Sequence, residues 1–325
     1  MDEGRILYLS RNDVESLGLG LPDIVSLLEF AFREKAAGRT AMPPKHWIER
    51  SPDTFYSAMT SYIPALGTAG CKWQSGDPRN PSRGLPYILG LFILCDDETG
   101  LPTAIMDSTW ITAMRTAAAS AVTARHLALK TAQAVGILGC GVQGRTNLEA
   151  LKLMIPTIKT CAAYDVKTDV AERYSVEMSE KLGMDVRAVA TAPEAVMDCD
   201  IIVTSGPIQR DSHPVIEPGW VRPGALGVAL DYDAYWTPSA VESMDYVETD
   251  DLNQIVHLKE HGYFRKVNRV DAELGDILVG GKPSRTTHDE RILAFNLGIA
   301  IEDLATATEI WRRALDRGFG TWLPL

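Results

Sequence analysis

Three glycines stand at the spacing of a dinucleotide-binding turn. Gly139, Gly141 and Gly144 follow the apolar run 134–138, and an acidic residue, Asp165, comes twenty-one positions after the last of them. In such a turn the first glycine permits a sharp bend, the second lets the backbone approach a pyrophosphate, and the third lets the next helix pack closely. The acidic residue accepts hydrogen bonds from ribose hydroxyls. The pattern predicts a nicotinamide dinucleotide site.

The phosphate preference of this site depends on Asp165. A carboxylate there repels a 2′-phosphate and favours NAD(H), while the nearby Lys167 softens that preference and leaves NADP(H) as the alternative. A second loop, 204–206, follows a later apolar run and is expected along the ribose and nicotinamide. The residues predicted to bind the cofactor are Gly139, Gly141, Val142, Gln143, Gly144, Asp165, Thr204, Ser205 and Gly206.

Three basic residues in largely apolar stretches are the first candidates for chemistry on a substrate. Lys45 follows Met-Pro-Pro, Lys72 lies in Gly-Cys-Lys-Trp-Gln, and Arg115 lies in Thr-Ala-Met-Arg-Thr-Ala-Ala-Ala-Ser. An arginine can hold a carboxylate through two hydrogen bonds, and a lysine in an apolar cleft can have a lowered pKa and transfer protons. Because a buried cation is costly unless paired, the alternative for each is an internal salt bridge or a side chain that reaches the surface.

The elements that must position these residues form two groups. From about residue 130, strand-like runs alternate with helical patterns at 135–138, 143–154, 160–164, 186–189, 201–204, 225–230 and 246–248, which is typical of a doubly wound parallel sheet. The preceding part mixes a helix over 21–38 with strands over 84–96 and 102–106, joined by a turn at 96–100, and a small-residue helix over 110–129.

The last part of the chain is expected to return to the first domain. A helical pattern runs from about 290 to 317 and is closed by Gly318. We therefore predict an α/β protein with a Rossmann-type domain over 129–290 and a split α+β domain made of 1–128 and 291–325. A cleft between the two would hold the substrate.

Composition limits the partners. The chain has 325 residues, 46% of them apolar and 23% charged, and a formal net charge of −11, which disfavours nucleic acid or an anionic membrane as the main partner. No apolar run reaches the roughly 20 residues of a membrane span, and the polar start lacks the features of a signal peptide. These features predict a cytoplasmic protein. The five cysteines are scattered and are expected to be reduced.

Two histidines, His257 and His261, stand four residues apart. This spacing can place both on one helix face, but the stretch lacks the glutamate position of the His-Glu-x-x-His motif and the sequence offers no evident third ligand. A solvated helix face is therefore expected, and no metal is predicted.

The motifs in combination resemble the ornithine cyclodeaminase/mu-crystallin family. The resemblance rests on the stretches around Lys72 and Arg115, on the segment 97–107, on the glycine turn and on Gly298-Ile-Ala-Ile-Glu-Asp-Leu-Ala-Thr-Ala. It implies a homodimer that associates through the split domain, a Rossmann domain that holds NAD(H) or NADP(H), and a substrate cleft.

The resemblance also implies roles for individual residues. Arg115 and Lys45 match the family's substrate-carboxylate ligands, and Lys72 matches a lysine that acts near the reacting carbon. An aspartate that aids catalysis or binds the amine falls at Asp233, with Asp231 as the second choice; a simple turn residue is the alternative there.

The family contains several reactions, and two departures bear on the choice. No carboxylate occupies 56–62, where cyclodeaminases carry a glutamate for the distal amine, and their Asp-x-Pro-Gly-Lys loop is replaced by an aromatic-rich one with Tyr232, Tyr235 and Trp236. Lysine at position 45 resembles the dehydrogenase branch, and the aromatic loop is expected to narrow the cleft. We therefore expect reversible hydride transfer to the α-carbon of a small imino or keto acid, as in alanine dehydrogenase-like or ketimine reductase-like members. The alternatives are ornithine cyclodeaminase and a non-catalytic, mu-crystallin-like binding protein.

Overall fold

The computed structural model describes residues 4–51 and 53–325 and resolves them into two compact units. Unit one ends at Arg115 and resumes over Ile299–Leu325, and unit two is Thr116–Gly298. The predicted domain boundaries lie at 128/129 and 290/291. Unit two therefore extends beyond its predicted range at both ends, by residues 116–128 and 291–298. The observed boundary between the units, at 115/116, falls inside a helix, α3 (Thr109–Leu127).

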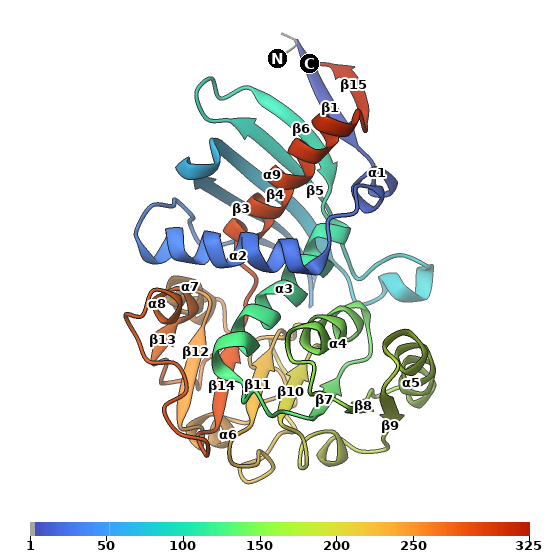
Figure 1. Ribbon diagram of the computed structural model, residues 1–325, viewed down its shortest axis with the longest axis vertical. Helices are drawn as coiled ribbons and strands as arrows, with labels where there is room; N and C mark the ends of the chain where they lie inside the picture. Colours follow the sequence, from blue (N-terminus) through green and yellow to red (C-terminus); the bar gives the residue numbers. More distant parts are fainter. Residues whose placement is uncertain (1–3, 52) are drawn as a thin grey trace. The chain divides into compact units, whose positions relative to one another are not determined.

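Unit one is built on a mostly antiparallel, seven-stranded sheet (Figure 1). Its strand order is β15-β1-β6-β5-β4-β3-β2, and the β1/β6 pair is parallel. Short 3₁₀ turns cover Pro64–Leu66 and Asn80–Arg83. The strands are β1 (Arg5–Leu9), β2 (His46–Ser51), β3 (Thr54–Ile63), β4 (Thr68–Gly76), β5 (Ile88–Asp96), β6 (Pro102–Asp107) and β15 (Thr321–Pro324). In addition to the first part of α3, the unit contains the helices α1 (Arg11–Ser16), α2 (Leu21–Ala36) and α9 (Ala300–Arg317).

One helix, α9, carries the C-terminal part of the chain onto this sheet. It packs against β3, β4 and α2, and its first eleven residues include a nearly continuous run of buried small and apolar side chains. Gly318, with φ of 69°, ends the helix in the left-handed conformation that glycine adopts without strain. Two acidic residues of the first turn, Glu302 and Asp303, are also buried, and Asp303 contacts Lys72 of β4.

Unit two is an eight-stranded, wholly parallel sheet flanked by helices (Figure 1). The strand order is β13-β12-β14-β11-β10-β7-β8-β9. The strands are β7 (Ala134–Leu138), β8 (Thr160–Tyr164), β9 (Asp185–Ala188), β10 (Ile201–Thr204), β11 (Leu226–Ala229), β12 (Tyr246–Thr249), β13 (Ala272–Glu273) and β14 (Ile292–Phe295), with helices α4 (Val142–Met154), α5 (Thr168–Leu182), α6 (Pro238–Glu242), α7 (Leu252–Glu260) and α8 (Leu274–Leu278) and a 3₁₀ turn at Pro193–Ala195.

The order of strands in this sheet reverses between β7 and β10. From β7 the chain proceeds through β8 to β9 in one direction, then crosses back to β10 and continues the other way. In doubly wound sheets, ligands bind beyond the carboxyl ends of the strands at such a reversal. The glycine turn after β7 and the loop after β10 therefore share the expected binding edge.

Two predicted elements, the strand over 84–96 and the helix over 290–317, are present but begin later than predicted. Residues 84–87 are not part of β5, because Gly84 (φ 72°) ends a 3₁₀ turn. More importantly, 290–299 is not helical: Ile292–Phe295 is β14, buried between β11 and β12 in the middle of the parallel sheet. A four-residue apolar run buried on both faces has no periodicity that separates strand from helix.

Most of the other predicted helices and strands are confirmed. The helices over 21–38, 110–129 and 143–154 are present with ends shifted by at most two residues, and the predicted strands of the parallel sheet are all found. All five cysteines are free. Within residues 4–51 and 53–325, no helix is both long and apolar enough to cross a membrane.

Candidate functional site

The three glycines of the turn after β7 have three different surroundings. Gly139 has φ of 102°, and a Cβ there would lie 2.8 Å from the carbonyl carbon of Ser205. A Cβ on Gly144 would lie 2.4 Å from the carbonyl oxygen of Gly139, so only glycine lets α4 start this close to the strand. A Cβ on Gly141 would meet no heavy atom within 4 Å. Gly141 is thus free of any packing requirement, as expected where a pyrophosphate must approach the backbone.

Asp165 is tied to the glycine turn from the next strand. Its carboxylate accepts hydrogen bonds from the backbone N–H of Cys140 at 2.9 Å and of Lys167 at 3.0 Å. These bonds hold the carboxylate at the end of β8, beside the N-terminus of α4. Cys140 itself is buried, and burial raises the pKa of its thiol to about 12, so the residue acts as a small filler and not as a nucleophile.

The loop after β10 is fixed to the glycine turn and to Asp231. Ser205 Oγ donates to the carbonyl of Gly139 at 2.8 Å. Asp231 accepts from the Thr204 hydroxyl at 2.8 Å and from the backbone N–H of Gly206 at 2.9 Å. The predicted loop therefore lies directly beside the glycine turn, with its conformation set by a buried carboxylate.

The two aspartates of the loop after β11 differ in environment. Asp231 is 1% exposed, and burial raises its pKa to about 7, against the hydrogen bonds from Thr204 and Gly206. Asp233 is partly buried; burial raises its pKa, and its carboxylate accepts from the backbone N–H of Phe264. Asp231 is thus an internal anchor of the loop, whereas Asp233 retains exposed surface.

Two of the three aromatic residues of this loop do not lie where the sequence suggested. Tyr232 and Trp236 are 2% and 1% exposed and belong to the apolar core of unit two, so they cannot narrow a cleft. Tyr232 has φ of 62°, a strained value for a non-glycine residue, and its ring packs edge-on against Tyr263 and tilted against Phe264. Tyr235 is partly exposed and lies over Gly206.

In unit one, Lys72 and Arg115 meet on the same carboxylate. Lys72 Nζ lies 2.7 Å from Asp303 Oδ1 and 3.2 Å from the Thr112 hydroxyl. Arg115 Nε lies 3.1 Å from the same Asp303 oxygen, and its Nη1 lies 3.0 Å from Glu302 Oε2. The internal salt bridge that the sequence offered as an alternative is therefore present for both cations.

Electrostatics set unusual charge states in this cluster. Burial lowers the pKa of Lys72 to about 7, because the loss of solvation outweighs the attraction of Asp303. Burial also raises the pKa of Glu302, whereas Arg115 and Lys72 together hold the pKa of Asp303 below its ordinary value in spite of burial. Lys72 can therefore gain or lose a proton near neutral pH.

Lys45 joins the cluster through its charge. It is 7% exposed, directly precedes β2, and acts electrostatically on Lys72 and on Glu302. The five side chains comprise three bases and two carboxylates. One carboxylate oxygen of Glu302 and one of Asp303 are buried without a hydrogen-bond partner among the described protein atoms.

Glu302 and Asp303 were missed as site residues in the sequence. In the sequence they form a pair of acidic residues among small and apolar ones at the start of a helix. Acidic residues are common in the first turn of a helix because they stabilise its N-terminus, so the pair did not stand out as a functional site. Their role emerges only when α9 is placed on β4, since 231 residues separate Lys72 from Asp303 along the chain.

Comparisons with known proteins find relatives over nearly the whole chain. The profile of the ornithine cyclodeaminase/mu-crystallin family matches residues 6–318. An alanine dehydrogenase of Archaeoglobus fulgidus is 34% identical over 97% of both chains.

Two similar solved structures contain nicotinamide cofactors. Thermococcus litoralis Δ(1)-pyrroline-2-carboxylate reductase, in complex with NADH and L-proline, is 33% identical with a TM-score of 0.88, over 97% of this chain and 99% of that one. An archaeal alanine dehydrogenase dimer with bound NAD is 32% identical with a TM-score of 0.87, over 99% of both chains.

Proposed function

The chain belongs to the ornithine cyclodeaminase/mu-crystallin family, and from this premise we propose that it is an NAD(H)-dependent oxidoreductase that reduces a small α-imino acid to an amino acid. The reaction is reversible and acts on CH–NH groups. The single observation that carries the proposal is the buried cluster in which Lys72 and Arg115 share one oxygen of Asp303.

The residues of unit two fit a nicotinamide dinucleotide. The backbone at Gly141, at the start of α4, has open space beside it for a pyrophosphate. Asp165 is held next to this turn, where its carboxylate would accept hydrogen bonds from ribose hydroxyls. The loop 204–206 completes the binding edge. Asp165 favours NAD(H), and replacement by asparagine is expected to weaken NADH binding by about tenfold while leaving NADPH binding less affected. When bound, the cofactor supplies or accepts the hydride.

The cluster of unit one fits a substrate that carries a carboxylate. With every member ionised, three bases and two acids leave one positive charge in a buried site, which a single substrate carboxylate neutralises. Arg115 and Lys45 would bind that carboxylate and hold the α-carbon in a reactive orientation. Their charges also disfavour a substrate without an anionic group.

Lys72 would hold the proton that the reaction needs. With a pKa of about 7, its ammonium form can donate to the nitrogen or oxygen at the α-carbon during reduction, and its neutral form can accept the proton during oxidation. Asp233, partly exposed, would pair with the cationic nitrogen, and Asp231 would keep the loop 204–206 in place.

Assembly into a homodimer is proposed through the outer face of the seven-stranded sheet. This face exposes apolar side chains on neighbouring strands and contains a hollow of about 320 Å³ lined by Trp73, Leu89 and Leu91 among others. The exposed apolar residues of the face include Ile48, Trp73, Leu91 and Ile93, at 57%, 47%, 46% and 40%. A contiguous patch of this kind marks an interface in soluble proteins. Light scattering should give a dimer mass for the wild type and a monomer mass for Leu91→Arg.

The activity test follows absorbance at 340 nm with purified protein and NADH or NADPH. Pyruvate, glyoxylate or oxaloacetate is supplied with ammonia or methylamine, and L-ornithine with NAD is run in parallel. NADH loss that requires both keto acid and amine supports the proposal. Proline and ammonia without net NADH would establish the cyclodeaminase instead. Tight binding of NADH and amino acids with no turnover of any substrate would indicate a binding protein.

A further inference from the structure

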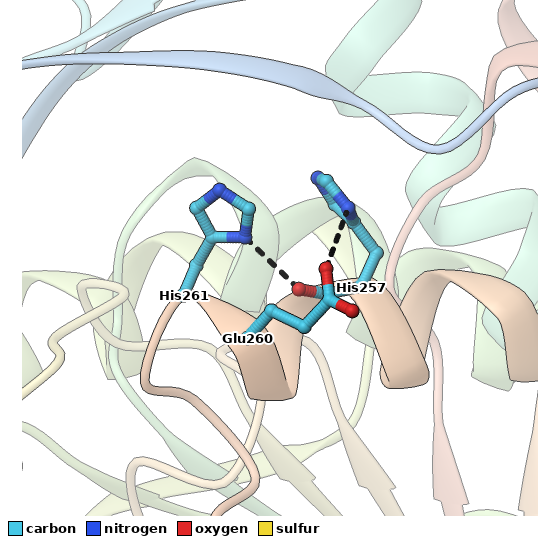
Figure 2. A group of neighbouring side chains, drawn as sticks. All are labelled: His257, Glu260 and His261. Atoms are coloured by element: carbon cyan, nitrogen blue, oxygen red, sulfur yellow. Dashed lines mark hydrogen bonds and ion pairs between the residues drawn. The ribbon is translucent and has the colours of Figure 1, made fainter.

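The last turn of α7 brings three metal-ligand side chains together. His257, Glu260 and His261 each offer one donor atom, and these atoms all lie within 4.8 Å of one another (Figure 2). The two imidazole rings are 4.4 Å apart between centroids, and His257 Nδ1 lies 3.9 Å from Glu260 Oε2. The sequence offered only the two histidines, and the structure adds Glu260 between them.

His261 is oriented by the backbone. Its Nδ1 lies 3.0 Å from the carbonyl oxygen of His257, one turn earlier. When Nδ1 carries the proton and donates to that carbonyl, Nε2 carries the lone pair that binds a metal ion. Backbone carbonyls commonly fix metal-binding histidines in this way.

The position on the helix favours a cation. The site lies at the C-terminus of α7, where the last carbonyl groups concentrate partial negative charge. Glu260 adds a full negative charge, and Lys259 is the basic neighbour on the same turn that opposes it.

We propose that His257, Glu260 and His261 form a binding site for a divalent transition-metal ion such as Zn²⁺. Two imidazoles and a carboxylate are a donor set that suits zinc, with water in the open position. Zinc–ligand distances of about 2.0–2.1 Å place tetrahedral donors about 3.4 Å apart. The side chains of His257 and Glu260 are 27% and 71% exposed, so small rotations at the surface can bring the three donors to this spacing.

A bound ion would act on the loop that holds Asp233. The chain leaves His261 through Gly262 and Tyr263 to Phe264, whose backbone N–H donates to the Asp233 carboxylate. The rings of Tyr263 and Phe264 pack against Tyr232 in the same loop. Fixing the end of α7 should therefore reduce the mobility of 262–264 and of the loop 231–236. Zinc binding and the mobility of these loops can both be measured without enzymatic turnover, so they are independent of the proposed enzymatic activity.

The test is titration calorimetry with Zn²⁺ on full-length protein that has been treated with chelator and desalted. We expect one ion per chain, and at least about tenfold weaker binding in His257→Ala, His261→Ala and Glu260→Gln, since even the loss of an outer partner of a metal site costs this much. His213→Ala, which removes an exposed histidine elsewhere, is the matched control and should bind as the wild type.

Three outcomes would overturn the proposal. They are binding that none of the three variants weakens, binding that Glu260→Gln leaves unchanged, which reduces the site to a simple histidine pair, and no saturable binding at all. Hydrogen exchange supplies a second measurement: Zn²⁺ should slow exchange in 262–264 of the wild type and leave it unchanged in His261→Ala. Circular dichroism verifies that each variant is folded.

Discussion

Lys72 and Arg115 both contact the same oxygen of Asp303, at 2.7 Å and 3.1 Å, in a place where all three side chains are buried. One carboxylate oxygen therefore sets the positions of two cations that come from different elements, β4 and α3. Neither cation can move without changing the solvation and the charge balance of the other. The consequences of this arrangement can be measured.

Removing the charge of Asp303 should destabilise the protein strongly. In Asp303→Asn two buried cations lose their shared partner, and breaking a buried ion pair from one side costs about 3–5 kcal/mol. The measurement is urea unfolding at neutral pH. Asp316→Asn, an exposed aspartate near the other end of α9, is the matched control and should change stability by less than about 0.5 kcal/mol. Equal small losses in both variants would show that Asp303 does not balance these cations.

The pH dependence of catalysis should follow Lys72. Burial lowers its pKa to about 7, so the protonated donor is lost as the pH rises through that value. We expect kcat/KM for imine reduction to fall above about pH 7 and kcat/KM for amino-acid oxidation to fall below it. The two profiles are measured with NADH and NAD, respectively. In Lys72→Arg, whose side chain stays protonated, the alkaline decline of any residual reduction should disappear. A decline that persists in this variant would assign the proton to another group.

Two glycines of the turn should separate cofactor binding from folding. Gly141→Ala places its Cβ in open space, so the thermal unfolding temperature should stay unchanged while NADH binding weakens by at least about tenfold. Gly144→Ala places its Cβ against the carbonyl of Gly139 and should lower both stability and NADH binding. Thermal unfolding and the fluorescence of bound NADH measure the two properties. Undiminished NADH binding by Gly141→Ala would argue against a pyrophosphate at this turn.

Asp231 should make stability depend on pH. Its pKa rises from an ordinary 3.8 to about 7 in the folded protein, because burial disfavours the charged form. The folded state therefore binds the proton more tightly than the unfolded state. The resulting stabilisation is complete below about pH 4 and is lost as the pH rises to about 7, by at most about 1.4 kcal/mol per pH unit.

Asp231→Asn removes this titration. As the pH rises from about 4 to 7, the wild type should lose unfolding free energy relative to the variant. Urea unfolding at several pH values measures this change. Asp245→Asn, at a more exposed carboxylate of the same unit, is the matched control for the substitution itself. A difference between Asp231→Asn and the wild type that does not change with pH would contradict a buried, proton-binding carboxylate.

The features that the sequence predicted best are those determined by residues close together along the chain. The glycine turn, the alternation of strands and helices around it, and the loop after β10 follow from patterns within about thirty residues, which is the length of one strand–helix–strand unit. The strand β14 was missed because a short apolar run can be buried in a sheet or in a helix, and only its neighbours β11 and β12 decide between them. The aromatic loop was misplaced because the sequence does not reveal which way Tyr232 and Trp236 point.

The acidic half of the cation cluster required long-range information. Lys72 and Arg115 were recognisable as cations in apolar surroundings, but their partners lie nearly 200 residues or more away on α9. Likewise, Glu260 becomes a candidate metal ligand only because the end of α7 brings its side chain close to the imidazoles of His257 and His261. In each case the missing information was the packing of an element and not its type.

The late position of α9 in the chain has a consequence for synthesis. A ribosome releases the amino terminus first, so the sheet strand with Lys72 and the helix with Arg115 emerge long before the acids that neutralise them, and the whole of 116–298 must be translated in between. Until α9 and β15 leave the exit tunnel, these basic groups have no counter-charges from α9 and the seven-stranded sheet lacks an edge strand and a covering helix. A nascent polypeptide that has not yet acquired α9 therefore cannot form the buried ion pairs of Lys72 and Arg115, so the arrival of this helix allows the charge cluster of unit one to form.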